Sequence, residues 1–154
     1  MCVLYCFCKT KAILGVQGGS PCHNEQSKAL NNKLTITSAA TSTEEIGNGI
    51  YPPVKAELKR HNINFAEHLA TQVKRSDYDK YDLFVVMDTN NVKNIMRIFG
   101  SDNENKVHKL LEYANRIGDV DDPWYSDRFD IAYNDIYGGC VGLVNHLNYV
   151  LNNR

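Results

Sequence analysis

The stretch LFVVMDTNNVKNIMRIFG, residues 83–100, decides the fold of this 154-residue chain. Its first five residues form a continuous apolar run, which is typical of a strand buried on both faces of a parallel sheet. Asp88 is suited to cap a helix over residues 89–99, and Gly100 is suited to end it. A buried strand that leads directly into a helix predicts one β–α unit of an α/β domain.

Outward from this unit, the sequence predicts three more strands and two more helices. The expected strands cover residues 3–8, 34–38 and 107–113, and the expected helices cover residues 51–61 and 128–151. Strands that alternate with helices predict a small, doubly wound, four-stranded parallel sheet flanked by helices, in a single domain of residues 1–154. Ligands of such sheets bind at the carboxyl ends of the strands.

The charge and hydropathy of the chain exclude several classes of partner. A formal net charge of −1, with both signs interspersed, predicts no binding to nucleic acid or to an anionic membrane. No apolar run approaches the roughly 20 residues that span a bilayer. The first 14 residues have no lysine or arginine before their apolar run, which makes a poor signal peptide, so we expect a cytoplasmic protein.

The five cysteines are unevenly distributed. Cys2, Cys6, Cys8 and Cys22 lie in the first 22 residues, and Cys140 lies far downstream. An odd number of cysteines argues against a disulfide framework. A zinc site can be imagined around the early group, but its spacing matches none of the usual zinc motifs, so we predict neither a metal nor another cofactor. Small apolar thiols that fill a buried strand are the preferred interpretation.

Three segments of the chain carry a family resemblance. They are TSAATS at 37–42 with EIGN at 45–48 and KRH at 59–61, FVVMD at 84–88 with an asparagine at 90 or 91, and DDPWY at 121–125. In their order, their intervals and the helix that follows them, they resemble the low-molecular-weight protein tyrosine phosphatases. The resemblance covers residues 34–154, and residues 1–33 diverge from the family pattern.

The resemblance implies hydrolysis of phosphotyrosine, on a protein or as a small aryl phosphate, without a cofactor. In that family a cysteine thiolate attacks the phosphorus. An arginine, separated from the cysteine by five residues, binds the phosphoryl oxygens. The loop between them turns its N–H groups inward, which binds a dianion and lowers the pKa of the cysteine. An aspartic acid then protonates the leaving phenolate.

The resemblance also implies roles for particular residues. Asp122 matches the general acid, and Trp124 and Tyr125 match the two aromatic residues that wall the slot for the substrate ring. Ser38 and His68 match positions that support the phosphate-binding loop through hydrogen bonds. Structural alternatives remain open: a plain Asp-Pro turn, half-buried aromatic residues and a core histidine. For Asp88 a helix cap is preferred to a catalytic role.

The cysteine-and-arginine loop of the family is missing from this sequence. The family's interval, counted back from Ser38 without gaps, places Phe7 at the nucleophile and Ile13 at the arginine. No cysteine of the chain has an arginine at the required offset. The weak candidates are Cys6, Cys8 and Cys22, which have Ala12, Leu14 and Lys28 there. Lysine offers a point charge in place of a two-pronged guanidinium, so none of them restores the loop.

Without this loop, the sequence predicts a phosphatase homologue that is impaired or inactive as written. A non-catalytic phosphotyrosine-binding module is the alternative, and a cysteine-based metal or redox protein is a third. One hypothesis for the divergent residues 1–33 is a compensated frame error, an unusual alternative start or a misassembled gene, and natural divergence is the other. The first hypothesis predicts that another reading frame encodes a cysteine-to-arginine loop upstream of Leu34.

Overall fold

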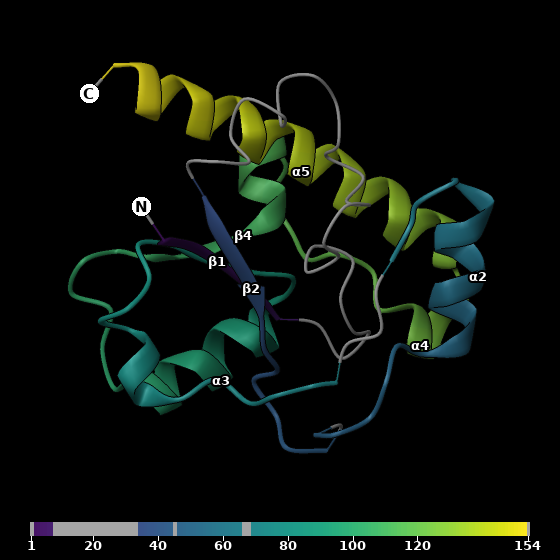
Figure 1. The fold of residues 1–154 in the computed structure, drawn as a ribbon, viewed down its shortest axis with the longest axis horizontal. Helices are drawn as coiled ribbons and strands as arrows, with labels where there is room; N and C mark the ends of the chain where they lie inside the picture. The colour runs from purple at the N-terminus through teal and green to yellow at the C-terminus, as the bar shows by residue number, and fades with distance from the viewer. Residues whose placement is uncertain (1, 8–33, 45, 66–68, 154) are drawn as a thin grey trace.

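The computed structural model describes residues 2–7, 34–44, 46–65 and 69–153, and Figure 1 shows its fold. The strands are β1 (Cys2–Phe7), β2 (Thr35–Ser38), β3 (Phe84–Val86) and β4 (Val107–Lys109). The α-helices are α2 (Pro52–Arg60), α3 (Thr89–Phe99), α4 (Pro123–Ser126) and α5 (Phe129–Asn152). Two short 3₁₀ helices are η1 (Arg75–Asp77) and η2 (Leu110–Ala114).

The four described strands form one parallel sheet in the order β2-β1-β3-β4. This confirms the predicted α/β class, and the apolar run near the N-terminus supplies a central strand. Cys6 of β1 is level with Ser38 of β2 on one side and with Val85 of β3 on the other. The chain passes from β1 to β2 on one side of the sheet and then crosses back past β1 to β3 on the other side, so the switch point of the topology lies between β1 and β3.

Helices cover both faces of the sheet, as Figure 1 shows with α5 above and α3 below the strands. Successive residues of a strand point to opposite faces, so the three residues of β3 serve two cores. Val85 packs in the core shared with α2, η2 and α5. Phe84 and Val86 pack in the core shared with α3. All three are fully buried, which explains why this segment has no polar residue.

The predicted ends of α3 and α2 agree closely with the structure. The side chain of Asp88 accepts a hydrogen bond from the backbone N–H of Asn91 and caps α3. Gly100 ends α3 with φ +85°, a conformation that glycine adopts without steric cost. After α2, Asn62 adopts φ +56°, as expected for a residue that terminates a helix.

The expected strand over residues 107–113 is partly wrong. β4 ends at Lys109, and the chain continues as η2 up to Asn115, which has φ +54°. In η2 both Leu110 and Leu111 are buried in the core with α5. Leu110 and Leu111 are adjacent and both point inward, which an extended strand with one covered face does not allow.

No helix in the described part of the chain is both long enough and apolar enough to cross a bilayer.

Asp102 organises the loop between α3 and β4. Its Oδ1 accepts hydrogen bonds from the hydroxyl of Tyr78, at 2.7 Å, and from the backbone N–H of Lys106, at 2.8 Å. Its Oδ2 accepts a third bond from the N–H of Val107, at 3.0 Å. Burial alone would raise the pKa of Asp102, but these hydrogen bonds bring it below the ordinary value.

Asp102→Asn is expected to lower the free energy of unfolding at neutral pH by about 1–3 kcal/mol, because an amide cannot accept all three bonds. The pKa of Asp102 is lower in the folded than in the unfolded chain. Its stabilisation is therefore present above the unfolded value, about 3.9, and is lost as the pH falls through the folded value. Urea unfolding from pH 7 to pH 3 should show the difference between the two proteins shrink below about pH 4.

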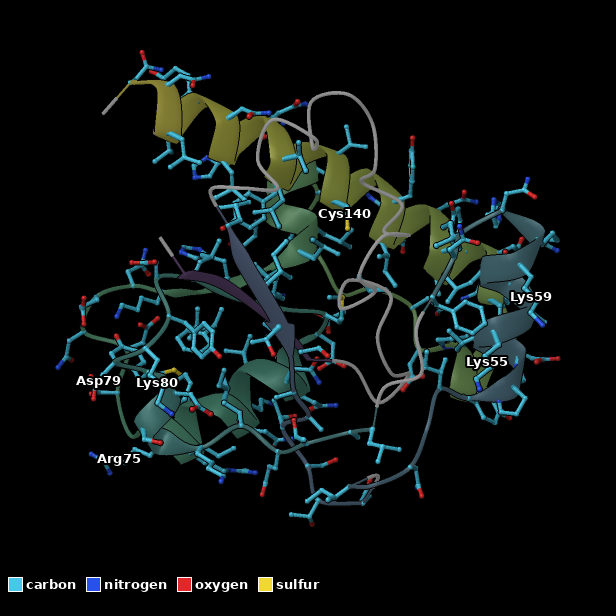
Figure 2. All side chains as sticks on the ribbon, in the orientation of Figure 1. Lys55, Lys59, Arg75, Asp79, Lys80 and Cys140 are labelled. Atoms are coloured by element: carbon cyan, nitrogen blue, oxygen red, sulfur yellow. The ribbon has the colours of Figure 1, made fainter. Side chains whose placement is uncertain are left out.

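Asp79→Asn is the matched control, because Asp79 is exposed at the surface (Figure 2). It should change the free energy of unfolding by less than about 0.5 kcal/mol. Equal losses in the two variants would contradict the assigned role of Asp102.

Candidate active site

The site expected from the topology lies where the parallel strands end. β1 ends at Phe7, which is level with Val86 of β3, and β2 ends at Ser38. Ser38 is buried, with 7% of its surface exposed. We call this end of the sheet the carboxyl edge. It brings the end of the central strand beside Ser38 and the residues that follow β3.

The junction between β3 and α3 is held by Asn91. Its side-chain oxygen accepts a hydrogen bond from the N–H of Met87, at 3.2 Å, and its own N–H donates to Asp88, at 2.6 Å. Asn91 is buried and Asn90 is exposed, so Asn91 is the asparagine with a structural role here. Burial, helped by the nearby charges of Asp119 and Asp122, raises the pKa of Asp88 despite the helix-capping bonds.

The segment 119–122 is tied to this junction. The N–H of Val120 donates to the carbonyl oxygen of Met87, at 3.0 Å. One carboxylate oxygen of Asp119 accepts from the hydroxyl of Thr89 and from the ammonium of Lys109, both at 3.0 Å. Burial alone would raise the pKa of Asp119, but the bonds from Lys109 and Thr89 bring it below the ordinary value.

The same segment is also tied to the helices that follow it. Asp121 accepts hydrogen bonds from the hydroxyl of Ser126, at 2.5 Å, and from the guanidinium of Arg128, at 2.9 Å. The bond from Ser126, with that from Arg128, lowers the pKa of Asp121. Asp119 and Asp121 are thus each paired with a cation.

Asp122 lies between the hydrogen-bonded residues 119–121 and α4. It is half-buried, its carbonyl oxygen accepts from the N–H of Ser126 at 3.3 Å, and Pro123 is buried at the start of α4. Its charge contributes to the raised pKa of Asp88 at the start of α3. The Asp-Pro pair therefore opens a single helical turn at the carboxyl edge, which the sequence pattern did not predict.

The structure describes the other predicted site residues only in part or not at all. Trp124 and Tyr125 belong to α4, but their side chains lie outside the described part of the structure. Cys6 is a residue of β1, for which only the backbone is described. His68, Cys8 and Cys22 lie outside the described residues. Of the predicted site residues whose side chains are described, Ser38 ends β2 and Asp122 directly precedes α4.

Cys140 is a residue of the core. It belongs to α5, at the position labelled in Figure 2, and is fully buried in the core with residues of α2, β3 and η2. A thiol in such apolar surroundings is a poor nucleophile, because burial disfavours the thiolate. Within the described residues, no group of three or more histidine, cysteine, aspartate or glutamate side chains is arranged to hold a metal ion.

Sequence reasoning missed the cations at this edge. Lys109 is ten residues and Thr89 thirty residues from Asp119, and no motif joins them. Only the asparagine after Asp88 carried a signal, and that signal did not distinguish position 90 from position 91. Arg128 was expected as the start of the last helix, not as the partner of Asp121.

Comparison with known proteins agrees with this arrangement. Residues 23–152 match the family described as low molecular weight phosphotyrosine protein phosphatase. The chain belongs to this family. It is 31% identical over 119 residues to the low molecular weight protein-tyrosine-phosphatase YfkJ of Bacillus subtilis, which is 76% of either chain. It is 29% identical over 117 residues to PtpA of Staphylococcus saprophyticus, 75% of this chain and 74% of that one.

Solved structures of family members have the same fold. The crystal structure of YfkJ from Bacillus subtilis superposes with a TM-score of 0.78 at 26% identity, over 96% of this chain and 94% of that one. The low molecular weight protein tyrosine phosphatase of Streptococcus pyogenes superposes with a TM-score of 0.72 at 27% identity, over 95% and 91%. The family match in sequence begins at residue 23, so β1 occupies a central position of the family's sheet with a sequence outside the match.

Proposed function

We propose that the carboxyl edge is a site for phosphotyrosine, on a protein or as a small aryl phosphate, with Asp122 in the place of the general acid. Family membership supports this substrate class. Of the three aspartates in the segment 119–122, Asp119 and Asp121 are engaged by Lys109 and Arg128. Asp122 is given the role of proton donor because it matches the general acid in the family resemblance and stands directly before Pro123 at the start of α4.

The proposal extends to the residues around that acid. Trp124 and Tyr125 wall the slot for the substrate ring, and Ser38 and His68 support the phosphate-binding loop. The buried position of Ser38 at the end of β2 is consistent with such support. The whole chain acts as a single domain. A cytoplasmic location is also part of the proposal, because an odd number of cysteines suits a reducing compartment.

The chain as written is proposed to lack turnover. One observation carries this: no cysteine in the sequence is followed, after five intervening residues, by an arginine. The end of β1, where the family interval places the nucleophile, is Phe7. Loss of both the covalent nucleophile and the phosphate clamp removes several kcal/mol of transition-state stabilisation, at about 1.4 kcal/mol per tenfold in rate. Asp122 alone cannot supply that.

Hydrolysis of p-nitrophenyl phosphate tests this proposal, with the relative YfkJ as a positive control at the same concentration. We expect a rate at least about 10⁴-fold below that of the control, because the covalent route is missing. Asp122→Asn should then leave the residual rate unchanged, since a general acid accelerates only a reaction that proceeds.

Serine variants of Cys6, Cys8 and Cys22 complete the test. Turnover near that of YfkJ, abolished by one of these substitutions and sharply lowered by Asp122→Asn, would overturn the proposed inactivity and identify the nucleophile. Zinc in stoichiometric amount in the purified protein would instead favour the cysteine-based metal protein.

A non-catalytic phosphotyrosine-binding module is the second candidate. Two features favour the binding module: hydrogen bonds hold the segment 119–122 in place, and the sequence has no recognisable nucleophile. Calorimetric titration with a phosphotyrosine peptide, with its unphosphorylated form as control, distinguishes the binding module from an inactive phosphatase homologue. Saturable binding of the phosphopeptide alone, without turnover, would support the binding module.

A further inference from the structure

We infer that Lys109 and Asp119 are positioning residues, which hold the segment carrying Asp122 against the carboxyl edge before any ligand binds. The inference rests on the proposed function, because it gives Asp122 the place of the general acid. Nothing in the sequence pattern marks either residue. Their role follows from contacts between β4, the start of α3 and the segment 119–122.

The contacts form a closed set of three groups. Lys109 Nζ donates to Asp119 Oδ1 at 3.0 Å and to Thr89 Oγ1 at 3.3 Å. The hydroxyl of Thr89 in turn donates to Asp119 Oδ1 at 3.0 Å. We call these three residues the edge clamp. Lys109 is the last residue of β4, and Thr89 is the first residue of α3. The two residues that hold Asp119 therefore belong to a strand and a helix.

The clamp acts next to a backbone bond that also fixes the segment. The N–H of Val120 donates to the carbonyl oxygen of Met87, whose own N–H is held by Asn91. Val120 is buried, with 7% of its surface exposed. The clamp on residue 119 and this bond on residue 120 together hold the chain at the third and second residues before Asp122. A proton donor needs hydrogen-bond reach to its acceptor, so this hold affects where the acid can act.

The expected effect is local and modest, because the clamp is partly exposed. The side chains of Lys109 and Asp119 are 24% and 42% exposed, and exposed ion pairs contribute little to global stability. The amide of Val120 reports local opening directly, since its hydrogen bond must break before it exchanges with solvent. Val73 supplies an internal reference, because its N–H donates to Ala40 at another part of the edge.

Amide hydrogen exchange by NMR tests the inference on the full chain. Lys109→Met and Asp119→Ala are each expected to speed exchange at Val120 about three- to tenfold, with Val73 unchanged. Lys109→Arg, which keeps the cation, should restore protection. Lys93→Met is the matched control, because it removes a lysine from the exposed surface of α3 and should leave Val120 unchanged.

Two results would overturn the inference. Unchanged protection of Val120 in both clamp variants would show that the backbone bond alone holds the segment. An equal acceleration at Val120 and Val73 would show a loss of global stability instead of local opening. Titration with phenyl phosphate, followed through the amide signals of residues 119–127, judges the proposed function separately. If the wild-type signals do not shift, the assignment of a phosphate ester to this edge fails, while the exchange result still decides the clamp.

Discussion

Gly142→Ala is expected to lower the free energy of unfolding by about 3 kcal/mol or more, the upper range for overpacking in a core. A Cβ atom at Gly142 of α5 would stand 1.9 Å from the carbonyl oxygen of Tyr113 and 2.5 Å from its carbonyl carbon. These are backbone atoms of η2, so no side-chain rotation relieves the overlap. The helix or η2 must move, which urea unfolding should register as a lower midpoint.

Gly138→Ala in the same helix is the matched control. No atom lies within 4 Å of a Cβ added there, so alanine should raise stability by about 0.5–1 kcal/mol through its higher helix propensity. Gly139→Ala should destabilise, because its Cβ would stand 2.4 Å from the Leu110 side chain. A loss at Gly138 similar to that at Gly142 would show that helix propensity, and not close approach, governs these positions.

The close approach of α5 to η2 matters for the site. η2 directly precedes the segment that leads to Asp122, and Arg116 in that segment is paired with the buried Asp135 of α5. A shift of η2 would therefore move the chain that carries the acid. Gly142→Ala should also speed amide exchange at Val120, whose N–H donates a hydrogen bond to Met87, the residue after β3.

Phe84→Ala is expected to cost about 3–5 kcal/mol, as is typical of a large cavity in a core. Phe84 has no exposed surface. Its ring centre lies 4.8 Å from that of Phe99 in an edge-to-face arrangement and 6.0 Å from that of Tyr78. Such ring pairs add to the stabilisation that burial provides. Thermal and urea unfolding should both show the loss.

Tyr149→Ala is the control for Phe84, because Tyr149 is 71% exposed on α5. It should change the free energy of unfolding by less than about 0.5 kcal/mol. Phe84→Leu should cost about 1.5 kcal/mol or less, since leucine fills part of the volume. Similar losses for Phe84→Ala and Phe84→Leu would contradict a cavity as the cause.

The β3–α3 unit could be predicted because its information is local. The buried run of β3, the cap at Asp88 and the stop at Gly100 all follow from neighbouring residues, and the structure confirms each. The long helix α5 was also predicted to within a residue at each end, because its apolar positions recur at helical spacing. The end of β4 was missed, because the turn into η2 depends on what α5 covers.

The candidate site divides in the same way. The Asp-Pro pair at 122–123 and the asparagine after Asp88 lie in segments that the family resemblance identified from the sequence. No sequence pattern predicts the turn of α4 or the partners of Asp119 and Asp121. The assignment of Asp122 as the acid stays a prediction, and its neighbours Trp124 and Tyr125 are proposed through the family resemblance.

By itself, the sequence determined the positions of β1, β2, β3, α2, α3 and α5, the parallel α/β class and the missing cysteine-to-arginine pattern. Those properties depend on residue type, on periodicity and on spacing along the chain. Only the tertiary structure decided that Lys109 and Thr89 meet Asp119, and that α5 approaches η2 at Gly142. Such contacts join residues that are far apart in the chain, and they exist only once the strand order brings β3 and β4 together at one edge.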